Sequence, residues 1–424
     1  MKLAILNSTA PGTAALLSPF FDALADFAEV ELTVLEQVPF SRYRQAPLDA
    51  TRPSHAPRCY RLEPLPTRFY NRRHACAQVL SGHFRSLLVE ANPDVIYILG
   101  EPGYLSTYQV VRFARRRLGK AKICLFAAQN VYQQFPPPFP SVERWVLARV
   151  DHAFPIGQDH ADVLRRKGYR GATTHLPLGV DTAIFTPERH GAPTRGIDLP
   201  RPVVGYVGEF LPTRDVPSLI EAVALCRRPV GLLLVGDGCT RPEVECLSRK
   251  HGLADRVKFA GRIAHAQIPD YMNYMDMLVL PSKAIQNRCF GIFRIANAEQ
   301  FGRVLVEAMA CGKPVIGSSC GEIPNVIGNA GKVYPEGDTG ALAAAIEGLC
   351  ADQGLRTRLG RAGLARARAR YDWRVIAAQL LSTMRGLLDP APSMRQRRKG
   401  SLRRARDIAA TGALTPWRTG SLPQ

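Results

Sequence analysis

Glu299 and Glu307 stand with seven residues between them in EQFGRVLVEAMACGKPVIGSS (residues 299–319), around Gly302, which is expected to open an amphipathic helix. The first main-chain amides of a helix, together with its dipole, favour an anion such as a diphosphate. Carboxylates accept hydrogen bonds from vicinal hydroxyls, which suits Glu307 to a ribose and Glu299 to a second sugar beyond the phosphates. This spacing indicates a site for a nucleoside diphosphate that carries a sugar.

The same residues also have a purely structural interpretation. Glu307 could pair with Arg303 at the i, i+4 spacing of a helix, and Glu299 could be a solvated charge at the helix start. Taken alone, the two glutamates leave both interpretations open.

Two parallel-sheet α/β units are predicted from apolar runs that alternate with helical patterns, since continuous runs of Val, Ile and Leu are typical of strands buried on both faces. In the first unit the runs are KLAILN, VELTVL, DVIYIL and KICLFA (2–7, 30–35, 94–99 and 122–127). In the second they are PVVGYVG, GLLLVG, RVKFAG, DMLVLP and PVIGS (202–208, 231–236, 256–261, 276–281 and 314–318). A cleft between two such units would place strand ends and helix N-termini of both around one ligand.

The domain boundary is predicted at TPERHGAPTRGIDLPRP (186–202), a stretch rich in Pro, Gly and charge. We expect a first Rossmann-like domain, a linker, a second Rossmann-like domain, a docking helix and a basic tail over 1–188, 189–201, 202–370, 371–388 and 389–424. The helix is expected because an apolar stripe recurs at helical spacing, at Trp373, Ile376, Leu380, Met384 and Leu388. The tail has few bulky apolar residues and clustered arginines, so we expect it to be disordered.

Composition narrows the class of protein. Of 424 residues, 46% are hydrophobic and 22% are charged, and no run of about eighteen apolar residues is present to span a bilayer. The ten cysteines show no CxxC pair and no metal-ligand spacing beside histidines, so we expect reduced thiols in a cytosolic protein, with no metal and no cofactor. The net charge of +20 indicates an anionic partner. Nucleic acid is disfavoured because no reader motif is present.

The chain resembles the retaining GT-B glycosyltransferases of family 4, whose signature is a Glu-x7-Glu pair in the context E-x-F-G-x-x-x-x-E-A-M-A-x-G-x-P-V-I. Beyond that pair, the match includes GYVGEFLPTRDVPSLIEAVA, LLLVGDG, RVKFAGRIAHAQIPDYMNYMDMLVLPS and GEIPNVIGNAGKVYPEGD (205–224, 232–238, 256–282 and 321–338). In the first half, residues 128–154 and 177–187 are also similar to that family, and the resemblance covers most of 90–388. It implies two Rossmann-like domains facing a cleft, the first binding the acceptor and the second the nucleotide sugar.

The resemblance also implies roles for single residues. Glu299 would be a catalytic residue on the hydroxyls of the donor sugar, and Arg214 in LPTRD would clamp the diphosphate. The main chain around Arg262 and Ile263 would hold the base. The substrate-binding residues expected on this basis are Gly208, Arg214, Arg262, Ile263, Phe301, Gly302, Arg303, Val304 and Glu307, the last on the ribose.

One departure from the family pattern is Glu209, which stands directly after VG, where family members usually carry an arginine. Two unit charges about 5 Å apart interact by roughly 3 kcal/mol at an effective dielectric near 20, so Glu209 should be turned away from the diphosphate or compensated. Compensation could come from Arg288 and Arg294 in KAIQNRCFGIFRIANA (283–298), a segment about nine residues longer than expected. The alternative is a surface insertion without contact to the ligand.

A second departure lies after the fourth strand, where many relatives have a histidine and this chain has Gln129 and Asn130. Neither amide can be a general base, but either can hydrogen-bond a sugar hydroxyl or orient an acceptor. We therefore expect Gln129 to bind substrate and Asn130 to assist catalysis. The family's proposed route, in which the leaving phosphate deprotonates the acceptor, needs no protein nucleophile.

The predicted function is transfer of a sugar, with retention, from a nucleotide-diphosphate donor to a glycan or lipid-linked glycan. Basic stretches at 68–73, 112–120 and 165–170 are either solvated helix faces or a surface for anionic lipid, with a cytoplasmic or peripheral membrane location. The alternatives are a catalytically inactive nucleotide-sugar-binding protein and an epimerase of the same architecture.

Overall fold

The computed structural model describes residues 1–8, 14–39, 59–69, 76–133, 135–189, 196–289 and 293–389. Residues Met1–Leu381 form one compact unit, and a second unit begins at Ser382. The strands all belong to the first unit, in two large sheets and one hairpin. None of the helices in these residues is long and apolar enough to cross a membrane.

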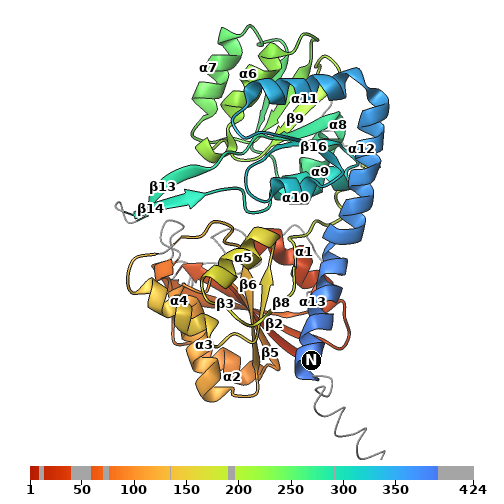
Figure 1. The fold of residues 1–424 in the computed structure, drawn as a ribbon. Coiled ribbons are helices and arrows are strands. Elements are labelled where there is room, and N and C mark those ends of the chain that lie inside the picture. The colour runs from red at the N-terminus through yellow and green to blue at the C-terminus, as the bar shows by residue number, and fades with distance from the viewer. Residues whose placement is uncertain are drawn as a thin grey trace, which may run out of the picture. The chain divides into compact units, whose positions relative to one another are not determined.

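The first sheet has eight strands in the order β4-β3-β2-β1-β5-β6-β7-β8 (Figure 1). Its central strand β1 pairs in parallel with β2 and β5, so that Leu3 stands opposite both Leu32 and Val95. Only β3 and β4 are antiparallel. The strands are β1 (Lys2–Asn7), β2 (Glu31–Pro39), β3 (Arg61–Arg68), β4 (Val79–Leu80), β5 (Val95–Leu99), β6 (Lys122–Ala127), β7 (His152–Pro155) and β8 (Ala172–Thr173).

The helices of this half are α1 (Ala14–Ala25), α2 (Phe84–Ala91), α3 (Leu105–Arg117), α4 (Phe139–Leu147) and α5 (Gln158–Arg166). One hydrophobic cluster joins strand residues such as Leu6 and Ile98 to Leu88 of α2, Val110 of α3 and Val146 of α4. Burial under these helices explains why β5 is apolar along its whole length.

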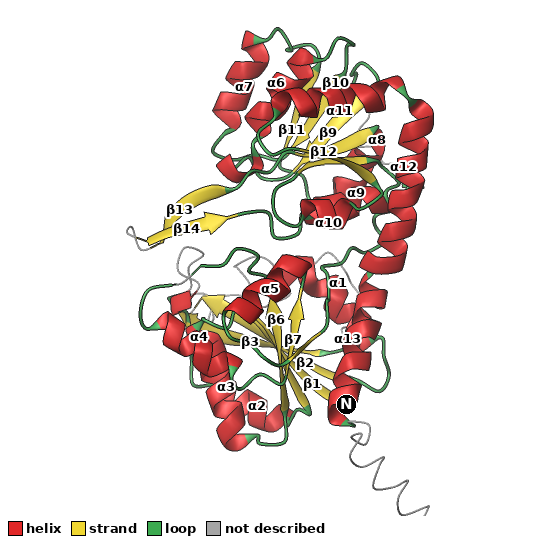
Figure 2. Ribbon diagram, viewed as in Figure 1, coloured by secondary structure: helices red, strands yellow, loops and turns green. Residues whose placement is uncertain are grey.

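The second sheet has six parallel strands in the order β11-β10-β9-β12-β15-β16 (Figure 2). Val203 of β9 belongs to a different hydrophobic cluster from its neighbour Val204, because successive side chains of a strand point to opposite faces. The strands are β9 (Val203–Val207), β10 (Gly231–Val235), β11 (Val257–Gly261), β12 (Met277–Leu280), β15 (Val315–Ser318) and β16 (Gly331–Tyr334). The helices are α6 (Val216–Leu225), α7 (Arg241–Lys250), α8 (Ile268–Tyr274), α9 (Arg303–Ala310), α10 (Ile323–Ile327), α11 (Thr339–Ala351) and α12 (Gln353–Arg366). The prediction of two parallel-sheet α/β units is confirmed.

The predicted insertion forms an antiparallel hairpin of β13 (Ile285–Cys289) and β14 (Phe293–Asn297). Its register places Arg288 opposite Arg294. The side chains of residues 287–295 lie outside the described part of the structure, so their predicted reach toward the donor stays a prediction.

The chain returns to the first sheet through a π-helical turn, Ala367–Tyr371, followed by α13 (Trp373–Leu388). Val180 N–H donates to Tyr371 O at 2.7 Å, and the Trp373 ring lies 5.1 Å from that of Phe20. Ile376 and Leu380 of the predicted stripe are buried with Trp373. The predicted domain limits stay a prediction, and the tail lies outside the described residues from 390 onward.

Candidate active site

A cavity of about 650 Å³ opens where β9, β10 and β12 end and α9 begins. This is the edge of a parallel sheet where ligands of such folds bind. The predicted residues that line it are Gly208, Arg214, Arg262, Ile263, Gly302, Arg303, Val304 and Glu307. The structure thus gathers into one cavity residues that are spread over 100 positions of the sequence.

Gly302 caps the helix that the sequence predicts. Its φ is +78°, a left-handed conformation that favours glycine, and a Cβ there would lie 2.8 Å from Leu280 Cδ2. Helix α9 starts at the next residue, so the main-chain amides of Arg303 and Val304 belong to its first turn. The first N–H groups of a helix have no intrahelical partner, which leaves them for an anion in the cavity.

Glu307 is buried on the first turns of α9, with 7% of its surface exposed. Its Oε1 lies 3.2 Å from His265 Nε2 and 3.6 Å from Arg303 Nε. The i, i+4 pair that the structural interpretation requires is therefore present, yet Glu307 also lines the cavity. No sequence pattern marked His265 as a site residue, although it lies two residues after Ile263 in a segment that resembles the family.

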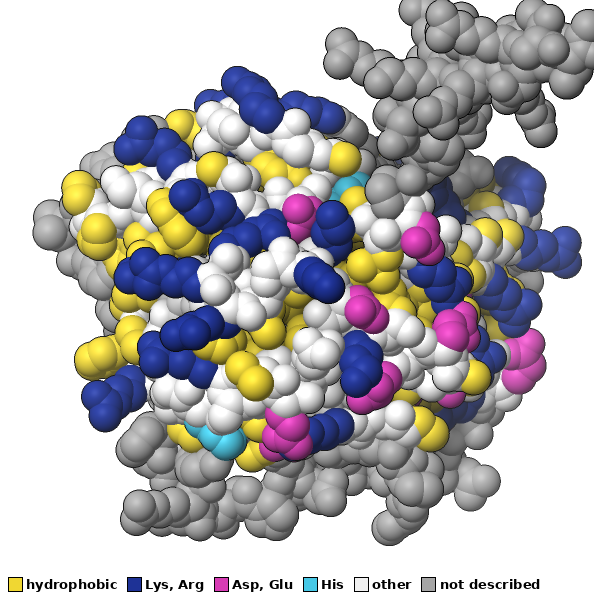
Figure 3. Space-filling model, turned by 90° about the horizontal axis from the view of Figure 1, so that it is seen from below, with side chains coloured by type: hydrophobic (Ala, Val, Ile, Leu, Met, Phe, Trp, Pro, Cys, Tyr) yellow, Lys and Arg dark blue, Asp and Glu magenta, His cyan; other side chains and the backbone are white. Residues whose placement is uncertain are grey.

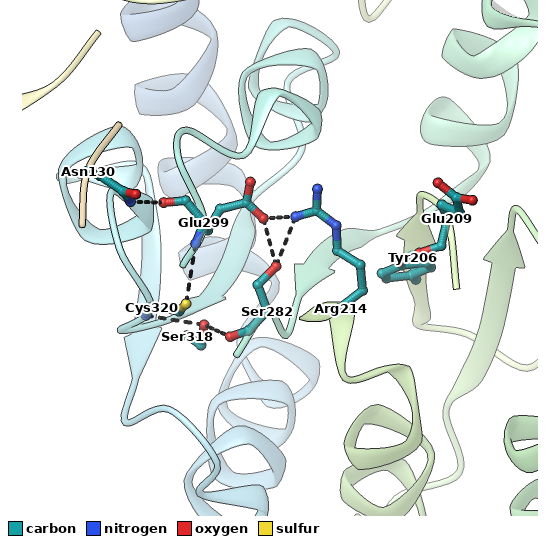
Figure 4. Close-up of polar contacts among 8 residues, drawn as sticks. All are labelled: Asn130, Tyr206, Glu209, Arg214, Ser282, Glu299, Ser318 and Cys320. Atoms are coloured by element: carbon teal, nitrogen blue, oxygen red, sulfur yellow. Dashed lines mark hydrogen bonds and ion pairs between the residues drawn. The ribbon is translucent and has the colours of Figure 1, made fainter. Parts of the chain in front are cut away.

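Glu299 is tied to Arg214 and Ser282, as Figure 4 shows. Arg214 Nη1 forms an ion pair with Glu299 Oε2 and also donates to Ser282 Oγ at 3.2 Å. The Ser282 hydroxyl in turn donates to Glu299 Oε2 at 2.8 Å. The Glu299 side chain is only 8% exposed and that of Arg214 is 32% exposed. The predicted diphosphate clamp is thus in contact with the predicted sugar-binding carboxylate.

A second cavity, of about 290 Å³, adjoins this ion pair. Gln129, Asn130, Lys283 and Glu299 line it, and Arg214 lines both cavities. Asn130 Nδ2 donates to the main-chain oxygen of Glu299 at 2.8 Å (Figure 4). Asn130 therefore positions the segment that carries Glu299, and its role in catalysis stays a prediction.

Phe301 and Cys320 are structural neighbours of the site. Phe301 is 3% exposed, packs edge-on against Tyr371 and lines neither cavity. Cys320 Sγ accepts a hydrogen bond from Glu299 N–H at 3.5 Å, and burial raises the pKa of its thiol to about 12. Cys320 therefore stays a thiol at neutral pH and is a poor nucleophile.

Glu209 lines the larger cavity but is exposed. In Figure 4 the Tyr206 ring lies between Glu209 and Arg214. The main-chain oxygen of Glu209 accepts a hydrogen bond from Tyr206 Oη at 2.9 Å. Within the described residues its carboxylate forms no ion pair. Its exposure lets water screen the charge, and compensation by Arg288 and Arg294 stays a prediction.

No group of three or more His, Cys, Asp or Glu side chains that could hold a metal ion occurs in the described ranges. The prediction that the protein uses no metal stays a prediction.

Two α/β units, each built on a mostly parallel sheet, are the architecture of the GT-B fold. Sucrose-phosphate synthase from Thermosynechococcus elongatus superposes with a TM-score of 0.69 at 23% identity, covering 92% of this chain and 99% of that one. HepE of Anabaena, solved in complex with UDP, gives 0.69 at 19% identity, covering 91% and 100%.

The sequence comparisons agree with this fold. Residues 192–366 match the family model "Glycosyl transferases group 1". A phosphatidyl-myo-inositol mannosyltransferase of Mycobacterium leprae is 32% identical over 48% of this chain and 50% of its own length. A D-inositol 3-phosphate glycosyltransferase of Stackebrandtia nassauensis is 30% identical over 62% and 60%. The chain spans half to three-fifths of the length of these relatives, and its residues 192–366 are similar to the glycosyl transferases of group 1.

Proposed function

We propose that this chain transfers a sugar, with retention of configuration, from a nucleoside diphosphate to a glycan or lipid-linked acceptor. The observation that carries the proposal is the convergence of Arg214, the first turn of α9, and both glutamates on adjoining cavities. These groups supply a cation and main-chain N–H donors for a diphosphate, and carboxylates that accept hydrogen bonds from sugar hydroxyls on either side of it.

In this proposal the diphosphate lies against the amides of Arg303 and Val304. Glu307 accepts from the ribose hydroxyls, and the base lies near Arg262 and Ile263. Glu299 accepts from the hydroxyls of the sugar that moves. The dipole and amides of α9 stabilise the charge of the departing diphosphate, which is the main electrostatic contribution of the protein.

Arg214 exchanges partners during the reaction. Its pairing with Glu299 gives way to the diphosphate, a stronger anion, and this frees Glu299 to accept from the sugar. The bond from the sugar's anomeric carbon to the phosphate oxygen breaks, and the acceptor oxygen bonds that carbon on the same face. The acceptor proton passes to the leaving phosphate, so no protein base is required.

The names of similar proteins guide the choice of substrates. Several matched relatives are named GDP-mannose-dependent mannosyltransferases acting on phosphatidylinositol monomannoside. HepE was solved with UDP and with UDP-glucose. Both bases therefore belong in the test, and an acceptor with a polyol or lipid head group is favoured.

A basic groove on the first half supports docking to an anionic lipid surface. A cavity of about 550 Å³ there is lined by Arg85, Arg112, Arg116 and Arg117 beside Tyr108 and two phenylalanines. These arginines are exposed on α2 and α3, and Figure 3, which views the molecule from below, shows Lys and Arg side chains spread widely over that surface. Each cation near such a surface contributes about 1 kcal/mol of binding. Loss of vesicle binding in the Arg116→Ala/Arg117→Ala variant would support docking, and retention would exclude this groove.

The function is tested with purified protein and a panel of UDP-, GDP- and ADP-sugars. A matching donor should raise the melting temperature by mass action and yield a retained glycoside with an inositol, glycan or lipid-linked acceptor. Donor binding without transfer or slow donor hydrolysis would point to an inactive binding protein. A sugar changed at C2 would point to an epimerase.

A further inference from the structure

Gln129, in the wall of the smaller cavity, is held by a buried lysine. Lys167 Nζ donates a hydrogen bond to Gln129 Oε1 and a second one to Glu143 Oε1, the latter at 2.6 Å. The Lys167 side chain is 3% exposed and that of Glu143 is 12% exposed. These contacts are shielded from water, so they hold the amide more firmly than surface contacts would.

The contact with lysine decides the orientation of the Gln129 amide. An ammonium group can only donate hydrogen bonds, so the amide oxygen must face Lys167 and the NH2 group must face elsewhere. Gln129 Nε2 is buried and has no hydrogen-bond partner among the described residues. Gln129 lines the cavity together with Glu299 and Arg214. A buried donor without an acceptor is unusual in a folded protein, and a ligand oxygen in this cavity would satisfy it.

The main chain of the same turn is also held. Glu101 Oε1 accepts a hydrogen bond from Ala128 N–H at 3.0 Å, directly before Gln129. Glu101 and Glu143 together with Lys167 therefore fix both the backbone and the side chain after β6. This turn is where many family members carry a histidine.

We propose that Lys167 is a positioning residue, which fixes the Gln129 amide so that its NH2 group donates to an oxygen of the sugar that is transferred. The inference rests on the proposed function, because it needs a sugar beside Glu299. It assigns Gln129 as a donor, so Gln129 cannot take the proton of the acceptor hydroxyl. Lys167 acts through Gln129 and does not touch the substrate.

A double-mutant cycle tests this assignment. Lys167→Met and Gln129→Met should each lower kcat by about tenfold, the value of one lost hydrogen bond. The double variant should be no slower than Gln129→Met alone, because Lys167 has no route to the substrate other than Gln129. Losses that multiply in the double variant would overturn the proposal. Lys250→Met, at the exposed end of α7, controls for the lost positive charge and should leave kcat unchanged.

Lys167→Met also leaves Glu143 without its cation, which could destabilise the fold. A second variant is therefore needed to separate a loss of stability from a loss of positioning. Lys167→Met/Glu143→Gln removes both charges and should fold with the same loss of kcat. Gln129→Glu keeps an oxygen toward Lys167 but has no N–H to donate, and it should also lose about tenfold. Wild-type turnover in Gln129→Glu would contradict the proposal.

A measurement without turnover separates this inference from the proposed function. The side-chain amide signals of Gln129 in a ¹H–¹⁵N spectrum are identified by their loss in Gln129→Met. Their exchange with solvent should be about tenfold faster in Lys167→Met/Glu143→Gln, and they should shift with a nucleotide sugar but not with the nucleoside diphosphate alone. Unchanged exchange would overturn the positioning role, whether or not the wild-type protein transfers sugar. Absence of transfer with every donor would instead remove the proposed function.

Discussion

Arg214, from the second half of the chain, and Lys167, from the first half, are two cations of the candidate site whose surroundings differ. Arg214 is 32% exposed, lines both cavities and pairs with one carboxylate, that of Glu299. Lys167 is 3% exposed and serves a carboxylate and an amide at once. In the proposed function Arg214 changes partners, and its place at the edge of water keeps the desolvation cost of that exchange small. The burial of Lys167 suits the proposal that it holds the orientation of Gln129.

The carboxyl groups reflect the same difference. Glu307, beside the donor cavity, has both Arg303 and His265 within 3.6 Å. In the first half, Lys167 pairs with Glu143, and burial raises the pKa of Glu101 to about 7 although the charge of Lys167 opposes the shift. In the proposed function, the charged groups of the second half face a ligand that carries the negative charge of a diphosphate. The buried charges of the first half hold the turn after β6 in place.

The largest expected effect is at Glu299. Glu299→Ala should lower kcat about 100-fold with a small change in donor affinity, because a hydrogen bond from the sugar to a charged group is worth about 1.5–3 kcal/mol. Steady-state kinetics with the matching donor measures both quantities.

Glu299→Gln is the matched control for packing. It keeps a carbonyl oxygen for Ser282 but cannot pair with Arg214, so it should retain the fold and lose most of the turnover. Near-wild-type kcat in both variants would mean that Glu299 is only a structural charge at the start of the helix and does not contact the sugar.

Glu307→Ala should chiefly weaken donor binding, raising the Kd of the nucleotide sugar about tenfold while kcat changes little, since the ribose does not react. Isothermal titration with donor and with free nucleoside diphosphate measures the loss. Arg303→Ala is the control. If it matches Glu307→Ala in melting temperature and affinity, the i, i+4 pair is the whole role of Glu307.

Glu101 should make stability depend on pH. Its carboxyl pKa is about 7 in the folded protein against an ordinary 4.5, so the folded state binds more protons between these values. The free energy of unfolding should therefore fall as pH rises from 4.5 to 7. Urea unfolding across this range should show that Glu101→Gln removes part of the decline.

Glu90 provides the contrast for that measurement. A hydrogen bond from Arg61 lowers the pKa of the exposed Glu90 below 4.5, so Glu90→Gln should leave the slope above that pH unchanged. An unchanged slope in Glu101→Gln would show that this carboxyl is not the group responsible.

The smallest effect is expected at Glu209. Glu209→Arg should tighten nucleoside diphosphate binding only about threefold, because exposed charges interact weakly through water. Fluorescence titration at low and high salt measures it, and high salt should remove the gain.

The Arg288→Ala/Arg294→Ala variant sharpens the same test. If these arginines reach the donor, the variant should bind the diphosphate much more weakly, and adding Glu209→Arg should restore much of the loss. Unchanged affinity would leave Arg214 and the start of α9 as the partners of the phosphates.

Several strands have no recognisable sequence pattern, for physical reasons. β3 contains Pro64 and Pro66 and has no continuous apolar run, so nothing marks it as a strand until β2 supplies its partner. β7 and β16 have four residues each, too few for a pattern to stand out. β2 extends to Pro39, beyond its apolar run, because its pairing with β3 continues.

The sequence by itself determined the strands of the two sheets with long apolar runs, the start of α9 after Gly302, and the spacing of Glu299 and Glu307. These are local features, since glycine conformation and helical periodicity act over a few residues. Only the tertiary structure decided which charges meet. It brought Arg214 into contact with Glu299. It also joined His265 to Glu307 and Lys167 to Gln129, pairs that lie 42 and 38 residues apart in the sequence. Partners at such separations are chosen by packing and burial, which no local pattern encodes.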